Sequence, residues 1–114
     1  MTRHDPLVRV RHMLDHAREA VAMVRARSRA DLDADRQLNL ALVRLVEVVG
    51  EAAARVPEDF RDRHPELPWR EAAGMRNRLI HGYDAVDFDI LWSLITQDLP
   101  PLIAQLEAIV EEAN

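Results

Sequence analysis

Cysteine and lysine are both absent from this sequence, and glycine and aromatic residues are scarce. Without cysteine the chain can form no disulfide and no thiolate metal site, which is compatible with the cytoplasmic location that we expect. The shortage of glycine and of β-branched runs argues against a sheet. No apolar run approaches the roughly 18 residues that a membrane span needs, and the N-terminus lacks the hydrophobic segment of a signal peptide. We therefore expect no membrane association.

What the sequence does contain is typical of a folded helical domain. Hydrophobic residues make up 48% of the 114 positions and charged residues 31%, a balance that indicates a globular protein and not a disordered one. The length suits one domain over residues 1–114, with no linker or internal repeat.

The charge is unevenly distributed along the chain. The net charge is −5, yet residues 1–29 contain seven arginines against Asp5, Asp15 and Glu19, a balance of +4 that leaves −9 for the remainder. All 15 basic residues are arginine, whose guanidinium binds phosphate as a bidentate fork. A compositional bias of the genome explains the arginines equally well, so the charge pattern alone does not identify a nucleic-acid partner.

Apolar periodicity predicts an all-α antiparallel bundle of four to five helices. Asp5 is a suitable N-cap, followed by Pro6 at the first helical position. Pro100–Pro101 must kink or restart the last helix, with Asp98 as a candidate cap. The predicted helices span about residues 5–27, 33–56, 57–63, 69–82 and 87–112.

The predicted helix at 33–56 is apolar around most of its circumference. Leu38, Leu42 and Leu45 belong to one stripe, whereas Leu40 and Val43 belong to another side. A helix with this pattern must be buried on more than one side, and a chain of this length has few other elements to cover it. We therefore predict a homodimer in which this helix contacts the second copy.

A cluster of polar residues falls where the predicted helix at 69–82 ends. In "GMRNRLIHGYD", residues 74–84, Asn77 and His81 would lie one turn apart on a regular helix, and Arg76 would diverge from His81 by about 140°. A long arginine side chain, or a second copy across a two-fold axis, could bring the two groups to one phosphate. The helix dipole would stabilise a protonated His81 at this end.

Arginine and histidine without a carboxylate cage suit the cleavage of RNA, which carries its own nucleophile in the 2′-hydroxyl. His81 would transfer protons, and Arg76 would stabilise charge on the phosphorane. DNA lacks that hydroxyl and should resist. The alternative is a solvated helix end with ordinary exposed polar residues, which spacing alone favours because short motifs match by chance.

The octet "RNRLIHGY" resembles the R-x4-H-x-Y signature of the HepT-like toxins of the HEPN superfamily. The segments "VEVVGEAAARVP", "LPWREAAGMRN" and "WSLITQDLPPLIAQLE" resemble the same family in order and spacing, so the likeness covers residues 5–110. The resemblance implies a dimeric, metal-independent ribonuclease with Arg76 and His81 as the catalytic pair and Asn77 as the polar residue that follows the arginine.

The same resemblance implies a partner and a mode of control. In some family members a minimal nucleotidyltransferase antitoxin attaches AMP to the tyrosine that matches Tyr83. The expected function is therefore an RNA endonuclease toxin that this antitoxin neutralises. Two alternatives remain at this point: a non-catalytic module that docks the nucleotidyltransferase, and a nucleotide-binding accessory protein.

Other candidate sites receive simpler interpretations. His12 and His16 are spaced to share a metal with Glu19, but exposed histidine pairs are common on helices, and we expect no metal and no cofactor. Glu51 is expected to pair with Arg55 one turn later, on the helix that also carries Glu47. The tryptophans, Trp69 and Trp92, are expected to anchor the core.

Overall fold

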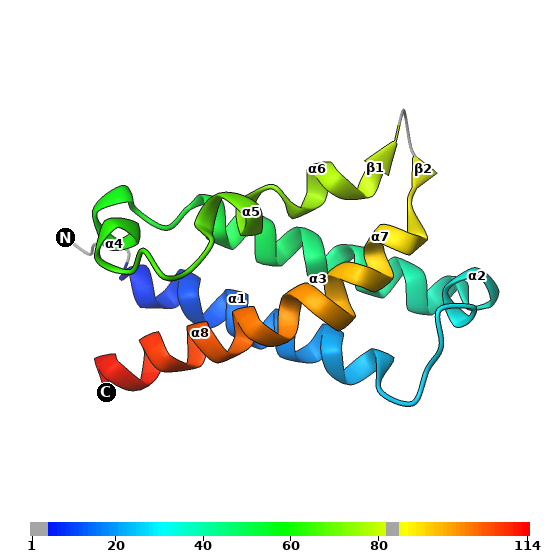
Figure 1. Ribbon diagram of the computed structural model, residues 1–114, viewed down its shortest axis with the longest axis horizontal. Helices are drawn as coiled ribbons and strands as arrows, with labels where there is room; N and C mark the ends of the chain where they lie inside the picture. The colour runs from blue at the N-terminus through cyan, green and yellow to red at the C-terminus, as the bar shows by residue number, and fades with distance from the viewer. Residues whose placement is uncertain (1–4, 82–84) are drawn as a thin grey trace.

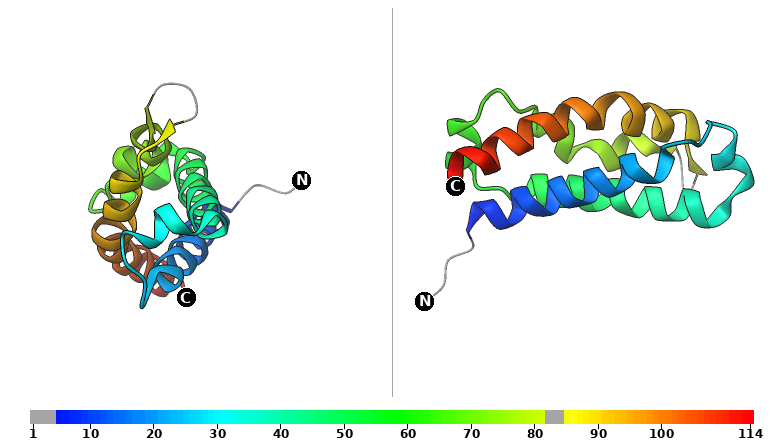
Figure 2. Two further views of the ribbon diagram at one scale, coloured as in Figure 1. Left: turned by 90° about the vertical axis from the view of Figure 1, so that its right-hand side faces the viewer. Right: turned by 90° about the horizontal axis from the view of Figure 1, so that it is seen from below.

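Three long helices form the frame of the computed structural model, which describes residues 5–81 and 85–114. They are α1 (Pro6–Val24), α3 (Arg36–Ala54) and α8 (Leu99–Ala113). Helix α1 runs antiparallel to α3 and also packs on α8, and the helices surround a common core in the end-on view (Figures 1 and 2). The described residues fill an elongated body of 46 × 31 × 26 Å.

Shorter elements connect the long helices. Two-residue strands β1 and β2 form an antiparallel pair in which Ile80 lies opposite Val86, and His81 opposite Ala85. These elements are α2 (Asp31–Ala34), α4 (Glu58–Arg63), α5 (Trp69–Ala73), α6 (Met75–Leu79), β1 (Ile80–His81), β2 (Ala85–Val86), α7 (Phe88–Ser93) and a π-helical turn, η1 (Leu94–Asp98). The all-α prediction is confirmed, with the small hairpin as an addition.

The core consists of apolar stripes on the long helices. Asp5 caps α1 by accepting a hydrogen bond of 2.9 Å from the Leu7 amide, as expected. On α1 the buried residues Val10, Leu14 and Ala17 face the bundle axis. On α8 the corresponding positions are Leu99, Leu102, Leu106 and Ile109.

Helix α3 is covered within the chain more completely than its sequence predicts. Val46 and Ala53, which lie on the same side as Leu40 and Val43, are fully buried. The cover comes from α1, α5, α6 and α7, which all contact α3. Gly50 lets α5 approach closely, because a Cβ at this position would lie 3.3 Å from the Ala72 carbonyl oxygen. Leu40 remains 51% exposed, so the open apolar surface of α3 is smaller than expected.

Two predicted helix boundaries are wrong. The first helix ends at Val24 and not near residue 27, because the chain turns through Ala26 in the left-handed region, with φ of 67°. The predicted helix at 33–56 is divided into α2 and α3 at Asp35, whose extended backbone and side chain cap α3.

The proline pair near the C-terminus is accommodated by η1. The backbone widens to π-helical geometry over Leu94–Asp98 and continues as α8 through Pro100 and Pro101, so the missing proline amides fall in the first turn of α8. Asp98 makes no capping hydrogen bond, contrary to our expectation. Its carboxylate instead accepts a hydrogen bond of 3.1 Å from Arg78. Among the described residues no helix is long and apolar enough to cross a membrane.

Candidate active site

The segment from Trp69 to His81, here called the motif segment, is not one helix. The predicted helix at 69–82 is interrupted at Gly74 into α5 and α6, and α6 ends at Leu79 because Ile80 turns to extended geometry, with φ of −99° and ψ of 123°. The amide of Asp87 then donates a 2.8 Å hydrogen bond to the Leu79 carbonyl. Helix α6 is therefore fixed at its end by the chain that returns through β2.

Helix α6 is buried at its two ends and exposed between them. Met75 and Leu79 are buried, one turn apart, and anchor the helix on the core. The three residues between them, Arg76 to Arg78, are all exposed. This short helix therefore presents a run of polar side chains while its two ends are held by apolar contacts.

Arg76 is oriented by a carboxylate of the neighbouring helix. Its Nε donates a hydrogen bond of 3.0 Å to Oε2 of Glu47 on α3. The Glu47 side chain is only 23% exposed, whereas the Arg76 side chain is 56% exposed. Among the described residues Glu47 pairs with Arg76 through Nε, so the terminal nitrogens of the guanidinium remain available for a phosphate.

A second arginine extends this arrangement along α3. Arg44 lies with Nη1 3.7 Å from Oε1 of Glu47 and 3.2 Å from Oε1 of Glu51. The expected pairing of Glu51 with Arg55 is thus replaced by pairing with Arg44, two turns earlier. Glu47 consequently lies between the guanidinium groups of Arg44 and Arg76.

Asn77 borders a hollow that Arg76 does not line. It borders a depression of about 460 Å³ together with Ile80, Ile90 and Ser93. The predicted alignment of Asn77 and His81 on one helix face is wrong, because the helix ends between them. Asn77 lies on α6, whereas the backbone of His81 belongs to β1.

The remaining residues of the motif fall at the edge of the described structure. The backbone of His81 pairs with Ala85, but its side chain lies outside the described part of the chain. Tyr83, and with it Gly82, lies outside the described residues. The structure thus brings Arg76 and Glu47 together and leaves the approach of His81 to Arg76 untested.

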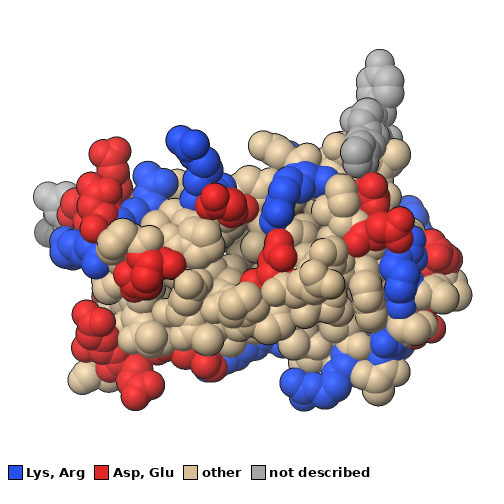
Figure 3. All heavy atoms as spheres, in the orientation of Figure 1, with Lys and Arg blue, Asp and Glu red and all other residues tan. Residues whose placement is uncertain are grey.

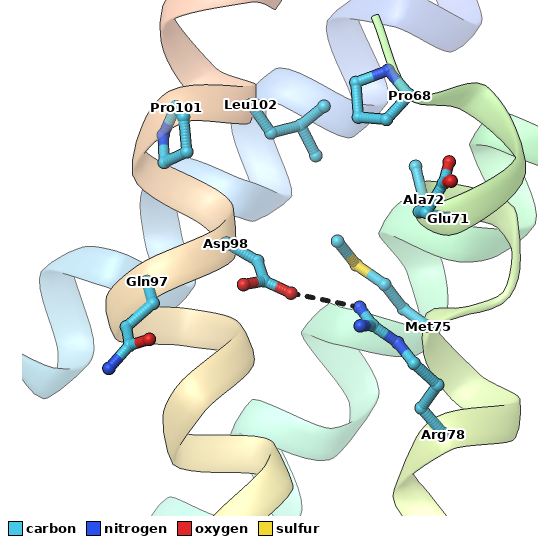
Figure 4. A pocket seen from close by; sticks show the side chains of 9 residues that line it. All are labelled: Pro68, Glu71, Ala72, Met75, Arg78, Gln97, Asp98, Pro101 and Leu102. Atoms are coloured by element: carbon cyan, nitrogen blue, oxygen red, sulfur yellow. Dashed lines mark hydrogen bonds and ion pairs between the residues drawn. The ribbon is translucent and has the colours of Figure 1, made fainter.

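A second pocket adjoins the hollow beside Asn77, because Arg78 and Asp98 line both, and Figure 4 shows it from close by. Arg78 and Asp98 meet across it at 3.1 Å, joining α6 to η1, and Met75 and Leu102 form part of its apolar wall. The pocket measures about 280 Å³. Its ion pair ties the motif segment to the last helix, and both charged groups are already partnered.

Sequence reasoning did not assign Glu47 to the site. The feature of the sequence that could have indicated its role is its position, because Glu47 interrupts the apolar stretch of α3 between Val46 and Val48. A carboxylate there is partly buried and needs a cationic partner. The sequence alone could not identify Arg76 as that partner, because the two residues are 29 positions apart.

The expected structural roles of the two tryptophans are confirmed. Trp69 is buried, and its Nε1 donates a 2.9 Å hydrogen bond to the His64 carbonyl. Trp92 packs partly buried against the core. His16 lies with Nδ1 2.7 Å from the carbonyl oxygen of His12, within the helix itself. No group of three His, Cys, Asp or Glu residues that could hold a metal occurs in the described ranges.

Comparisons with known proteins show which family the chain resembles. A family model described as "Ribonuclease HepT-like" matches residues 13–109. A protein of Thermococcus cleftensis named "Probable ribonuclease HepT" is 37% identical over 100 residues, which are 84% of this chain and 91% of the relative. A protein of Caldanaerobacter subterraneus subsp. tengcongensis, named as a candidate RNase, is 37% identical over 101 residues, 89% of this chain and 90% of the relative. No solved structure gives a significant match.

Proposed function

The chain belongs to the HepT-like ribonuclease family, and we propose that it is an RNA endonuclease toxin acting without a metal through Arg76, Asn77 and His81. The observation that carries this proposal is the Arg76–Glu47 hydrogen bond of 3.0 Å. It holds an exposed guanidinium by its Nε and leaves the fork free, five residues before the histidine of the family motif. The names of the relatives support RNA as the substrate.

The reaction needs one proton removed and one supplied. The ribose 2′-oxygen loses its proton and attacks the adjacent phosphorus, and the bond from phosphorus to the 5′-oxygen breaks as that oxygen gains a proton. The products are a 2′,3′-cyclic phosphate and a 5′-hydroxyl. His81 exchanges these protons, because imidazole both accepts and donates near neutral pH. Arg76 stabilises the charge that builds on the phosphorane oxygens. Asn77 contributes a polar contact beside them.

A second copy of the chain completes the site. Leu40 is 51% exposed in the N-terminal half of α3, where an apolar contact between copies would place two motif segments near each other. Light scattering should give about twice the 13.1 kDa chain mass. If the protein is a stable monomer at micromolar concentration, Arg76 and His81 have no second copy of the same pair opposite them, and this part of the proposal is wrong.

The central experiment measures cleavage of a labelled RNA in EDTA. The wild type should cut RNA, leave the matching DNA intact and release 2′,3′-cyclic phosphate ends. His81→Ala and Arg76→Ala should each lose activity by about 10²-fold or more. Arg70→Ala is the matched control, because Arg70 is an exposed arginine on α5 in the same segment. Full activity of His81→Ala in cells would instead favour a non-catalytic module that docks a nucleotidyltransferase.

Control by a nucleotidyltransferase antitoxin is the second part of this proposal. AMP attached to Tyr83 would place an anion close to the motif segment, where it would compete with RNA phosphate for Arg76. Co-expression with the antitoxin and ATP should add one or more AMP units to Tyr83 and suppress toxicity. Tyr83→Phe should keep the nuclease and escape suppression. An unmodified chain that is nevertheless neutralised would assign control to binding alone.

A further inference from the structure

A shallow groove between α1 and α3 gathers positive charge on an otherwise acidic protein. It measures about 180 Å³, and its charged lining residues are Arg9, Arg44, Glu51 and Arg55, with His12 beside them. We propose that this groove binds the phosphate backbone of RNA that extends beyond the Arg76 site. The inference rests on the proposed ribonuclease function and adds to it a second place of contact with the substrate.

The charges of the groove are only partly compensated. Glu51 is paired with Arg44 at 3.2 Å, so these two neutralise each other. No ion pair joins Arg9 or Arg55 to any residue within the described ranges. Two guanidinium forks therefore converge on one hollow without a carboxylate of their own. This arrangement suits an anion that brings its charge from outside.

The groove is connected to the candidate active site by a chain of charged groups. Arg44 lines the groove and also lies 3.7 Å from Glu47, and Glu47 holds Arg76 at 3.0 Å. Arg44, Glu51 and Arg55 follow one face of α3 over about 17 Å at 1.5 Å per residue. This length exceeds one phosphate group, so an extended strand is a better match than a free phosphate ion.

The residues that line the groove suit the phosphate backbone of RNA better than its bases. Its apolar lining residues are Val48 and Ala52, and the ring in its lining is the small imidazole of His12, so the groove offers no broad surface for base stacking. The charge distribution elsewhere agrees with this assignment, because acidic side chains gather over the C-terminal turns of α8 and would repel a polyanion (Figure 3). A protein of net charge −5 needs a local basic surface to bind RNA, and this groove supplies one.

The test measures binding in a cleavage-deficient His81→Ala background, so that its outcome does not depend on the nuclease. Fluorescence anisotropy with a single-stranded RNA gives Kd at several salt concentrations. Arg9→Gln with Arg55→Gln should lower the slope of log Kd against log salt by about 1.4, at roughly 0.7 per lost phosphate contact. At 0.15 M salt this corresponds to a roughly tenfold weaker Kd.

The matched control removes the same charge at the other end of the two helices. Arg25 follows α1, and Arg36 begins α3, and neither has an ion pair with a described residue. Arg25→Gln with Arg36→Gln should leave the slope within about 0.3 of the parent, since no phosphate contact is lost. Equal slopes for the two double variants would overturn the proposal.

Two further outcomes separate this inference from its alternatives. If the groove variant keeps its salt slope but changes its mass in light scattering, the groove is a contact between copies and the proposal is wrong. If the parent binds RNA through the groove but the wild type never cleaves it, the groove stands and the proposed nuclease fails. Circular dichroism of both double variants checks that they remain folded.

Discussion

The scaffold helices and the motif segment are stabilised in different ways. Helices α1, α3 and α8 contain 15 to 19 residues each and bury continuous apolar stripes. The motif segment contains two five-residue helices and a two-residue strand. Helices of five residues have no stability of their own in water, because nucleation costs more than so few hydrogen bonds return. The candidate active site therefore takes its geometry from the helices on which it packs.

This difference explains how so small a protein exposes several polar groups in a row. The ends of α6 are anchored by Met75 and Leu79, and its flanks by ion pairs to Glu47 on one side and Asp98 on the other. Exposed ion pairs stabilise a fold weakly, but they restrict the direction of a side chain. The scaffold thus supplies the stability, and the ion pairs supply the orientation of the arginines.

The largest expected effect comes from the same substitution made in both regions. Leu42 on α3 and Leu79 on α6 are both fully buried, so Leu42→Ala and Leu79→Ala should each lower the free energy of unfolding by about 2–5 kcal/mol. Only Leu79→Ala should also lower the RNA-cleaving activity of the molecules that remain folded, because Leu79 anchors the helix that carries Arg76.

Urea unfolding measured beside cleavage under native conditions separates the two effects. Leu42→Ala is the control, since Leu42 belongs to a long scaffold helix and not to the motif segment. If the folded fractions of both variants cleave RNA equally well, α6 keeps its position without its apolar anchor, and the distinction between the regions is wrong.

The scaffold was predictable from the sequence because its pattern is long and regular. The stripe of Val10, Leu14 and Ala17, and that of Leu42 and Leu45, repeat over several turns, so a single misplaced residue does not obscure them. The family resemblance rests on the types and spacing of the motif residues, which can be read from the sequence without knowing the backbone geometry. Both conclusions, the all-α fold and the HepT-like family, are confirmed.

The backbone of the motif segment was not predictable in the same way. Gly74 is compatible with a helix, and nothing local in the sequence places the helix end at Leu79 instead of Gly82. The decisive interactions are the pairing of Ile80 with Val86 and the contact of Arg76 with Glu47. Both join residues that the sequence does not link, so periodicity could predict neither of them.

A smaller effect is expected from the residue that orients Arg76. Glu47→Gln keeps an acceptor for the Arg76 Nε but removes the charge, and should lower kcat by about tenfold, with stability changed by less than about 1 kcal/mol. KM should change less than kcat if Glu47 acts by aligning Arg76 for the transition state.

Glu51→Gln is the matched control for this change. Glu51 lies one turn away on the same helix and pairs with Arg44, and within the described ranges it forms no ion pair with Arg76. Equal kcat values for Glu47→Gln and Glu51→Gln would show that the charge near the site matters in general, and that Glu47 does not position Arg76.

The smallest effect should appear at the start of α3, where the scaffold depends on a single titrating group. Asp35 accepts a hydrogen bond of 3.0 Å from the Leu38 amide. This bond, more than the nearby Arg27, holds the pKa of the carboxyl below its ordinary value. A lowered folded-state pKa adds stability that is fully present above the ordinary aspartate pKa of about 3.9 and is lost as the pH falls through the folded value.

Asp35→Asn can still cap the helix but cannot titrate, so it should be slightly less stable than the wild type at pH 7 and match it at low pH. Urea midpoints measured from neutral to acidic pH would show the two curves converging. A constant separation over that range would mean that the cap does not act through its charge.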